Sequence, residues 1–171
     1  MKHYLASFFL LSALIFIAPI TQANNALYQL SFSNIDAEQV NLSEYKGKVV
    51  LLNFWATWCP PCIKEMPSMQ RLKEKMTDQP FEIVAVNVGE NATTVSSFLL
   101  ELEPELTFPI MLDEQGSSFG KLGLRGLPMS LIYDQQGNLV TTILGGKEWD
   151  APANIQELKQ LINPKQLNTQ N

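Results

Sequence analysis

The sequence predicts an α/β fold with one mostly parallel sheet that ends in an antiparallel hairpin. Two continuous apolar runs, residues 49–56 and 81–88, have the composition of central strands that are covered on both faces. A segment of helical periodicity, 60–77, follows the first run. Two further strand patterns, 129–133 and 139–144, flank a Gly-containing turn and predict the hairpin. At 171 residues the chain is long enough for one domain with its own core and too short for two.

The other elements follow from the same patterns. Alternation over residues 27–32 predicts a strand, with 39–42 as its hairpin partner. Further helices are expected wherever apolar residues recur at helical spacing, and a short apolar run predicts one more strand. These segments are helices 93–102, 117–122 and 153–162, and strand 108–112. No internal repeat or second domain is expected.

Residues 1–23 are predicted to be a signal peptide. Lys2 forms a short positive region, residues 5–18 are apolar apart from two serines, and residues 21–23 offer a small-residue cleavage site. The apolar run of roughly 14 residues is shorter than the ~20 of a membrane-spanning helix. Cleavage is therefore favoured over an uncleaved membrane anchor. We expect an exported, periplasmic protein with one domain at 24–163 and a polar tail at 164–171.

Composition excludes several kinds of chemistry. The formal net charge of −5 argues against nucleic acid as a partner. Cleavage would remove His3, the only histidine. A cysteine protease would then lack its base, and two thiolates supply only half of a closed zinc site. We therefore expect no cofactor apart from a redox-active disulfide.

The only two cysteines, Cys59 and Cys62, lie where the first apolar run gives way to a helix. The ring that they can close is too small to stabilise the fold much, so redox function is favoured over a structural staple. Cys59 would lie at the helix N-terminus, where the macrodipole stabilises a thiolate, so we expect it to attack and Cys62 to resolve. Pro60 and Pro61 have no amide hydrogens, which weakens that stabilisation and favours a reductant.

Glu65 lies one turn beyond Cys62, within the apolar face of the expected helix. A carboxylate in that position would be partly desolvated, with a raised pKa, and could exchange a proton with the Cys62 thiol. A surface glutamate at the edge of the apolar face explains the same spacing. The helical wheel alone does not separate the two interpretations.

The stretch Trp55-Ala56-Thr57-Trp58-Cys59-Pro60-Pro61-Cys62 resembles the active-site motif of thioredoxin-fold proteins, in particular the exported TlpA/ResA-like thiol–disulfide oxidoreductases. The resemblance covers residues 27–162 and includes Gly146-Lys147-Glu148-Trp149. It implies a thioredoxin-like fold with an N-terminal β-hairpin extension and a central helix–strand insertion at 91–112. It also implies that Glu65 is the acid that this branch carries after the second cysteine.

The same resemblance extends to Gly123-Leu124-Arg125-Gly126-Leu127-Pro128. It implies that Pro128 is cis and shapes the substrate groove together with Leu127, whereas the residues alone predict an ordinary trans proline before a strand. Met129 follows where threonine is common in the family. Trp58, Pro60 and Pro61 complete the expected substrate-binding surface, although a tryptophan there could equally pack beneath the site.

The resulting expectation is a monomeric protein-disulfide reductase that acts on protein thiols and disulfides and is re-reduced by a membrane electron donor. In the family, substrates include apocytochrome c cysteines during cytochrome c maturation. Two alternatives remain: a thiol oxidase or isomerase on the same fold, separable by reduction potential, and a non-enzymatic metal-carrying module, separable by a metal assay.

Overall fold

The computed structural model describes residues 25–164, so the predicted signal peptide and all of the polar tail after Pro164 lie outside the described residues. These residues form a seven-stranded sheet with the order β2-β1-β5-β4-β3-β6-β7. Its strands are β1 (Ser31–Asn34), β2 (Gln39–Asn41), β3 (Val49–Trp55), β4 (Phe81–Val88), β5 (Ile110–Asp113), β6 (Met129–Tyr133) and β7 (Leu139–Leu144). The helices are α1 (Pro60–Lys75), α2 (Ala92–Glu101), α3 (Ser118–Leu122) and α4 (Pro152–Ile162), with short 3₁₀ helices η1 (Ala26–Gln29) and η2 (Leu42–Tyr45).

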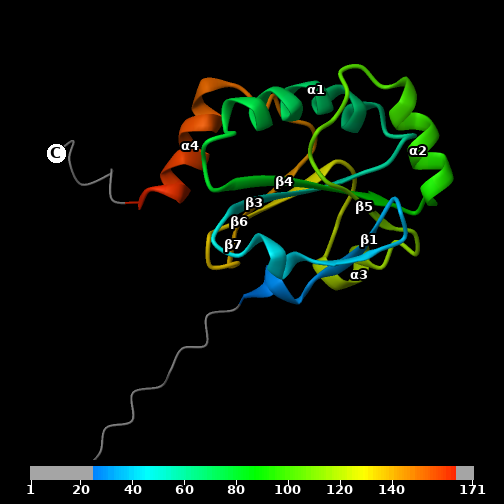
Figure 1. The fold of residues 1–171 in the computed structure, drawn as a ribbon, viewed down its shortest axis with the longest axis horizontal. Helices are drawn as coiled ribbons and strands as arrows, with labels where there is room; N and C mark the ends of the chain where they lie inside the picture. Colours follow the sequence, from blue (N-terminus) through cyan, green and yellow to red (C-terminus); the bar gives the residue numbers. More distant parts are fainter. Residues whose placement is uncertain (1–24, 165–171) are drawn as a thin grey trace, which may run out of the picture.

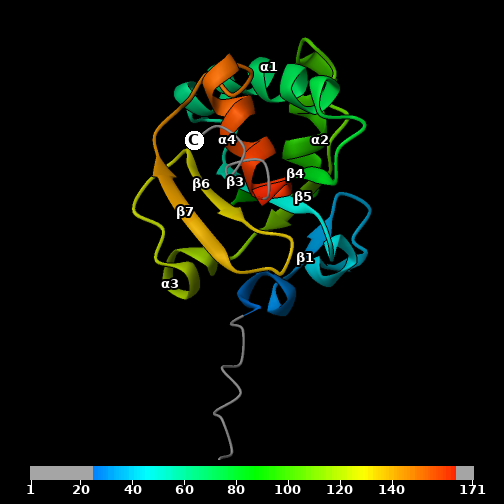
Figure 2. The same cartoon turned by 90° about the vertical axis from the view of Figure 1, so that its left-hand side faces the viewer.

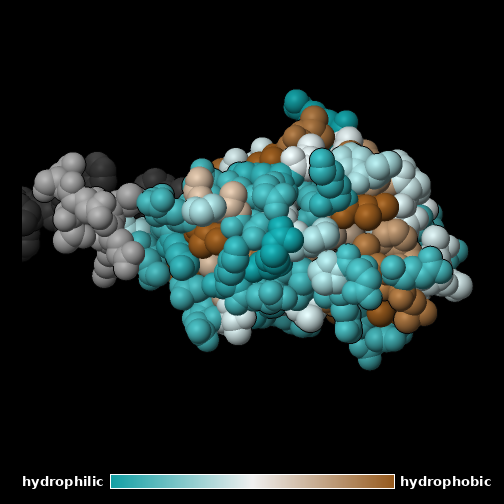
Figure 3. All heavy atoms as spheres, turned by 90° about the horizontal axis from the view of Figure 1, so that it is seen from above, coloured by the Kyte–Doolittle hydropathy of each residue, from teal (hydrophilic) through white to brown (hydrophobic). Residues whose placement is uncertain are grey.

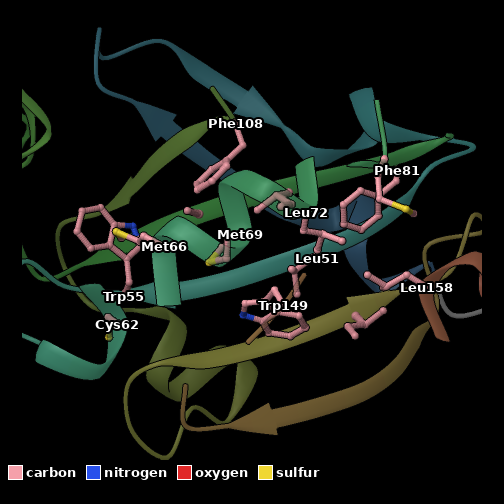
Figure 4. Packing of buried hydrophobic residues seen from close by; sticks show 14 of the residues in the cluster. Leu51, Trp55, Cys62, Met66, Met69, Leu72, Phe81, Phe108, Trp149 and Leu158 are labelled. Atoms are coloured by element: carbon pink, nitrogen blue, oxygen red, sulfur yellow. The ribbon is translucent and has the colours of Figure 1, made fainter. Parts of the chain in front are cut away.

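The sheet separates two layers of covering elements. Helices α1, α2 and α4 lie over one face, and α3 and the N-terminal segment lie on the other (Figures 1 and 2). On the first face, Met66, Met69 and Leu72 of α1 point down onto the sheet, and Trp149 packs beside Leu51 (Figure 4). Seen from outside, this face is mostly polar, and apolar side chains gather at the end where α2 lies (Figure 3). A second buried cluster fills the space between the sheet and the opposite layer.

The central strands explain how the site is assembled. β3 and β4 are buried along their whole length and run parallel, as the apolar runs predict. β6 lies antiparallel to β3 on its other side, with Phe54 opposite Met129. The start of β6 therefore lies beside the end of β3. This arrangement brings Pro128, which precedes Met129, to the edge of the sheet where the chain leaves β3 for the cysteines.

The N-terminal prediction is wrong in its first half. Residues 26–29 form η1, and the strand begins only at Ser31. The alternating pattern misleads because Leu27 is buried under the β6–β7 hairpin, where its amide donates to the Gly137 carbonyl (3.2 Å). Tyr28 adds a hydrogen bond from its hydroxyl to the carbonyl of Gln135 (2.8 Å). The predicted pairing of this strand with its hairpin partner is confirmed, since β1 and β2 are antiparallel.

The central insertion and the C-terminal elements have the predicted order. α2 and β5 occupy the predicted insertion, and β6, β7 and α4 close the fold. The Leu127–Pro128 bond is cis, and so is the Glu103–Pro104 bond, which no sequence pattern predicted. No helix within residues 25–164 is long and apolar enough to span a bilayer.

Candidate active site

Cys59 and Cys62 form a disulfide at the start of α1, with their Cα atoms 5.3 Å apart. Cys59 is the residue that caps the helix N-terminus, and Cys62 lies in the first turn. Cys62 is fully buried, whereas Cys59 keeps 4% of its surface exposed. A substrate that approaches from solvent therefore meets Cys59 first.

The two prolines occupy the first two positions of α1, as the motif requires. Neither has an amide hydrogen to offer to a Cys59 thiolate. The next two amides, of Cys62 and Ile63, both donate to the Cys59 carbonyl oxygen (3.0 and 3.2 Å). The helix N-terminus thus presents fewer free donors to the sulfur than an ordinary helix start does.

Glu65 is buried, with 4% of its surface exposed, which rules out the surface alternative. Its Oε1 accepts from Asn53 Nδ2 (2.9 Å), and its Oε2 accepts from the Lys147 amide (3.0 Å) and from Trp149 Nε1 (2.9 Å). Burial raises the pKa of the Glu65 carboxyl, and the three donated hydrogen bonds oppose that rise without cancelling it. The carboxylate is therefore fixed in position and easier to protonate than an ordinary glutamate.

The donors to Glu65 are themselves held by other parts of the fold. Asn53 Nδ2 also donates to Ser130 Oγ (2.9 Å), which ties β3 to β6. Ser68 Oγ donates to the Glu65 carbonyl oxygen (2.8 Å) and accepts from the Trp149 amide (3.0 Å). Residues 146–149 were identified from the sequence only as a feature shared with the family, with no role in the site. The partners within this segment could not be found from the sequence, because they meet α1 only through the closing hairpin.

Gly146 explains how this segment comes so close to α1. A Cβ atom at this position would lie 3.2 Å from the Pro61 carbonyl oxygen, so a larger residue would push the segment away from the first helical turn. Further along, Asp150 accepts hydrogen bonds from Arg71 (2.8 and 3.0 Å) and Lys75 (2.8 Å) on α1. The approach that places the donors of Glu65 therefore depends on the absence of a side chain at Gly146.

The loop before Cys59 has a second carboxylate that sequence reasoning missed. Glu90 accepts from the Thr57 amide (2.7 Å), from Thr57 Oγ1 (2.6 Å) and from Asn87 Nδ2 (2.8 Å). Its position just after β4 is the available signal, because the carboxyl ends of neighbouring parallel strands meet at one edge of the sheet. Glu90 thus ties the loop that carries Cys59 to the end of β4.

The two tryptophans of the motif have opposite surroundings. Trp55 is fully buried and packs on Phe98 of α2, with ring centroids 5.7 Å apart. Trp58 is 67% exposed. Packing beneath the site therefore applies to Trp55 and not to Trp58.

The remaining predicted binding residues lie around the disulfide loop. Pro60 and Pro61 are exposed, and Pro128 is buried. Leu127 packs against both core clusters, one of which contains the two cysteines. The structure thus joins the start of α1 and the cis-proline segment through a shared core.

A helix-capping disulfide, a cis proline at the adjoining strand and a buried carboxylate one turn into the helix together define a thiol–disulfide oxidoreductase of thioredoxin-like fold. Comparison with known proteins agrees. The family model described as Redoxin matches residues 22–162. The thiol–disulfide oxidoreductase ResA of Halalkalibacterium halodurans is 33% identical over 146 residues, which cover 85% of this chain and 80% of that protein. The chain belongs to this family.

Two further comparisons support the family and the fold. The ResA protein of Geobacillus thermodenitrificans is 40% identical over 113 residues, which span 66% of this chain and 64% of that protein. The crystal structure of the exposed lipoprotein thioredoxin Etrx1 from Streptococcus pneumoniae is 29% identical and matches with a TM-score of 0.64, covering 77% of this chain and 98% of that one. The predicted thioredoxin-like fold is therefore confirmed.

Proposed function

We propose that this oxidoreductase reduces disulfide bonds in exported proteins, with Cys59 as the attacking thiol and Cys62 as the resolving thiol. The observation that carries the proposal is the Cys59–Cys62 disulfide at the start of α1, where Cys59 keeps 4% of its surface exposed and Cys62 is fully buried. A thiol–disulfide exchange site needs one accessible nucleophile and one sheltered resolving thiol within reach.

The cycle begins with the reduced protein. The Cys59 thiolate attacks one sulfur of a substrate disulfide, forms a mixed disulfide and releases the other substrate sulfur as a thiolate. The Cys62 thiolate then attacks the Cys59 sulfur, which closes the Cys59–Cys62 disulfide and releases the second substrate sulfur. Two electrons have passed to the substrate, and a dithiol donor must return two electrons to the protein. We propose that a membrane thiol reductase is this donor.

Glu65 is proposed to accept the proton of Cys62 as that thiol becomes a nucleophile. Its place one turn beyond Cys62, together with a pKa that burial raises, makes it a better proton acceptor than an ordinary glutamate. The three donors that fix its oxygens keep the carboxylate oriented while it gains or loses the proton. Asn53, Lys147 and Trp149 act in this proposal as positioning groups.

The direction of electron flow is proposed from the helix start. Because Pro60 and Pro61 offer no amide hydrogens, the Cys59 thiolate is less stabilised than in a strong oxidant, and the disulfide form is favoured. We therefore expect a reduction potential well below about −120 mV, the value typical of a strongly oxidising protein of this kind. A measured potential near that value would instead favour the oxidase or isomerase alternative.

The proposed location is the periplasm, supported by the pattern of residues 1–23. The mass of the protein purified from the expressing cell tests this, because cleavage leaves a chain that begins at Asn24. A chain that retains residue 1 and sediments with membranes indicates the anchored alternative. We further propose that the protein acts as a monomer, which light scattering at several protein concentrations checks.

Apocytochrome c is the proposed substrate class, on the basis of the family resemblance. Cells that lack the protein should contain less cytochrome c with covalently bound haem, and the wild-type chain should restore it. The Cys59→Ala variant should not. Normal cytochrome c in the deleted strain would exclude this role and leave the reductase activity to other substrates.

The experiment that tests the assignment of the cysteines is trapping. Cys62→Ala should accumulate mixed disulfides through Cys59, because the resolving thiol is missing. Cys59→Ala should accumulate none, since the remaining sulfur is buried. Equal trapping by both variants would reverse or remove the assignment, and mass spectrometry of the trapped species identifies the substrates.

A further inference from the structure

A groove of about 490 Å³ lies beside the cis-proline segment, on the face of the sheet that carries α3. Its walls come from the end of α3, from the segment that leads to β6 and from the end of β7, which run side by side (Figure 2). The residues that line it are Leu122, Gly123, Arg125, Met129, Thr142 and Leu144. The thiol chemistry proposed above makes no use of this groove.

The groove has an apolar floor and one apolar wall. Met129 forms part of the floor with 5% of its surface exposed, and Leu144, its cross-strand partner on β7, keeps 60% of its surface in solvent. Leu144 therefore adds accessible apolar surface to one wall of the groove, next to the apolar floor at Met129.

Among the described residues that line the groove, Arg125 is the one with a charged side chain. Arg125 is exposed, and within residues 25–164 it has no ion pair. By contrast, Arg71 on α1 is held by Glu148 and Asp150. The acid that faces the loop before Cys59, Glu90, is already occupied by Thr57 and Asn87. The Arg125 guanidinium is therefore available to a ligand carboxylate.

The position of the groove determines what can enter it. Met129 follows Pro128 directly and lies opposite Phe54 near the end of β3, from which the chain continues to Cys59. A polypeptide that approaches Cys59 over this edge of the sheet places its neighbouring residues along the cis-proline segment and the end of β7.

We propose that this groove binds the substrate chain next to its reacting cysteine and selects an apolar residue followed by an acidic one. The apolar side chain packs on Met129 and Leu144, and the carboxylate pairs with Arg125. This inference rests on the proposed function and names the class of protein segment that it serves. The positive charge of Arg125 attracts such a segment at short range, against the overall net charge of −5.

The test uses the reduced full-length protein and three short peptides that differ at one position. Each peptide carries a cysteine, an adjacent leucine and then Glu, Gln or Lys, and its cysteine is joined in a disulfide to a chromogenic aryl thiol. Attack by Cys59 on the peptide sulfur forms the Cys59–peptide disulfide and releases the aryl thiolate, which is followed by absorbance. We expect kcat/KM for the Glu peptide to exceed that for the Lys peptide by about tenfold or more at low salt, and the ratio to fall towards one at high salt.

Variants locate the source of the preference. Arg125→Glu should reverse the order of the Glu and Lys peptides. Lys159→Glu is the matched control, because it makes the same charge change at an exposed lysine on α4, and it should leave the ratio unchanged. A fourth peptide, with alanine in place of the leucine of the Glu peptide, tests the apolar contact. Met129→Thr should reduce the advantage of the leucine peptide over this alanine peptide without changing the ratio of Glu to Lys.

Several outcomes would overturn the inference. A ratio near one in the wild-type protein shows that there is no charge selection. An equal change with Lys159→Glu assigns the preference to overall charge, and a change confined to Lys64→Glu assigns it to the exposed lysine near the other side of the disulfide. Failure of all three peptides, including the neutral one, would instead contradict the proposed function itself, and the inference would fall with it.

Discussion

The buried, inner side of the disulfide, around Glu65, is held by hydrogen bonds, whereas the solvent-facing, outer side, around Trp58, is exposed. On the inner side, both oxygens of Glu65 accept hydrogen bonds, and the groups that donate them come from β3 and from the segment before α4. On the outer side, Trp58 and the two prolines face solvent. A proton acceptor works best when it is held in one place, whereas a surface that receives different proteins must be accessible. Under the proposed function, the inner side governs the chemistry and the outer side governs recognition.

Removing the inner carboxylate should have the largest effect. Glu65→Gln keeps the shape of the side chain but cannot accept the proton of Cys62. We expect closure of the Cys59–Cys62 disulfide from the mixed disulfide to slow by about 10²–10⁴-fold, while the first attack by Cys59 stays unchanged. Rapid acid quenching with mass spectrometry separates the two steps.

The control for this variant is Glu74→Gln, an exposed glutamate on the same helix. It should alter neither step. If Glu65→Gln slows attack and resolution equally, the residue acts by supporting the structure and not as a proton acceptor.

Loss of one donor to Glu65 should have the next largest effect. Trp149→Phe removes the Nε1–H that bonds to Oε2, and a hydrogen bond to a charged group is worth roughly 1.5–3 kcal/mol. We therefore expect the free energy of unfolding to fall by more than the change of ring size explains. Urea denaturation of the oxidised protein at neutral pH measures it.

Trp55→Phe is a matched control, because the Nε1–H of Trp55 is buried without a hydrogen-bond partner. This substitution changes the same ring and breaks no hydrogen bond. It should destabilise the protein less than Trp149→Phe does. An equal loss in both variants would show that ring packing, and not the bond to Glu65, sets the cost.

The raised pKa of Glu65 also predicts how stability depends on pH. The folded protein holds this proton more tightly than the unfolded chain does, so the stabilising contribution is complete below the unfolded value of about 4.3. It is lost as the pH rises from there through the raised pKa. The free energy of unfolding of the wild type should therefore decline relative to that of Glu65→Gln across this window. Parallel curves for the two oxidised proteins would show that the pKa is not raised.

The main elements of the fold were predictable because their signals are local. The apolar runs of β3 and β4 and the helix after the cysteines lie within two residues of their predicted bounds. The burial of Glu65 was not predictable from the helical wheel. Its partners, Asn53 and the segment around Trp149, lie 12 and 84 positions away in sequence. Only the packed sheet brings them together.

The features that the sequence did not predict also depend on contacts between residues far apart in the chain. The segment around Leu27 alternates like a strand, but the hairpin turn above it accepts its amide and bends the chain into η1. Glu90 carries no local signal for its bonds to Thr57, because the two are joined by the adjacency of β3 and β4. The cis form of Pro128 follows from the family resemblance and not from the residue itself.

The outer side should show the smallest effect on the fold. Trp58→Ala removes an exposed side chain, so the free energy of unfolding should change by no more than about 0.5 kcal/mol. KM for a protein substrate should nevertheless rise severalfold, since an exposed tryptophan supplies a large contact area to a partner. The rate at which Cys62 closes the disulfide should not change, because Trp58 donates no hydrogen bond to Glu65. Urea denaturation and steady-state kinetics measure the first two quantities. A slower closure in this variant would show that the two sides of the disulfide are coupled, and the division between chemistry and recognition would have to be abandoned.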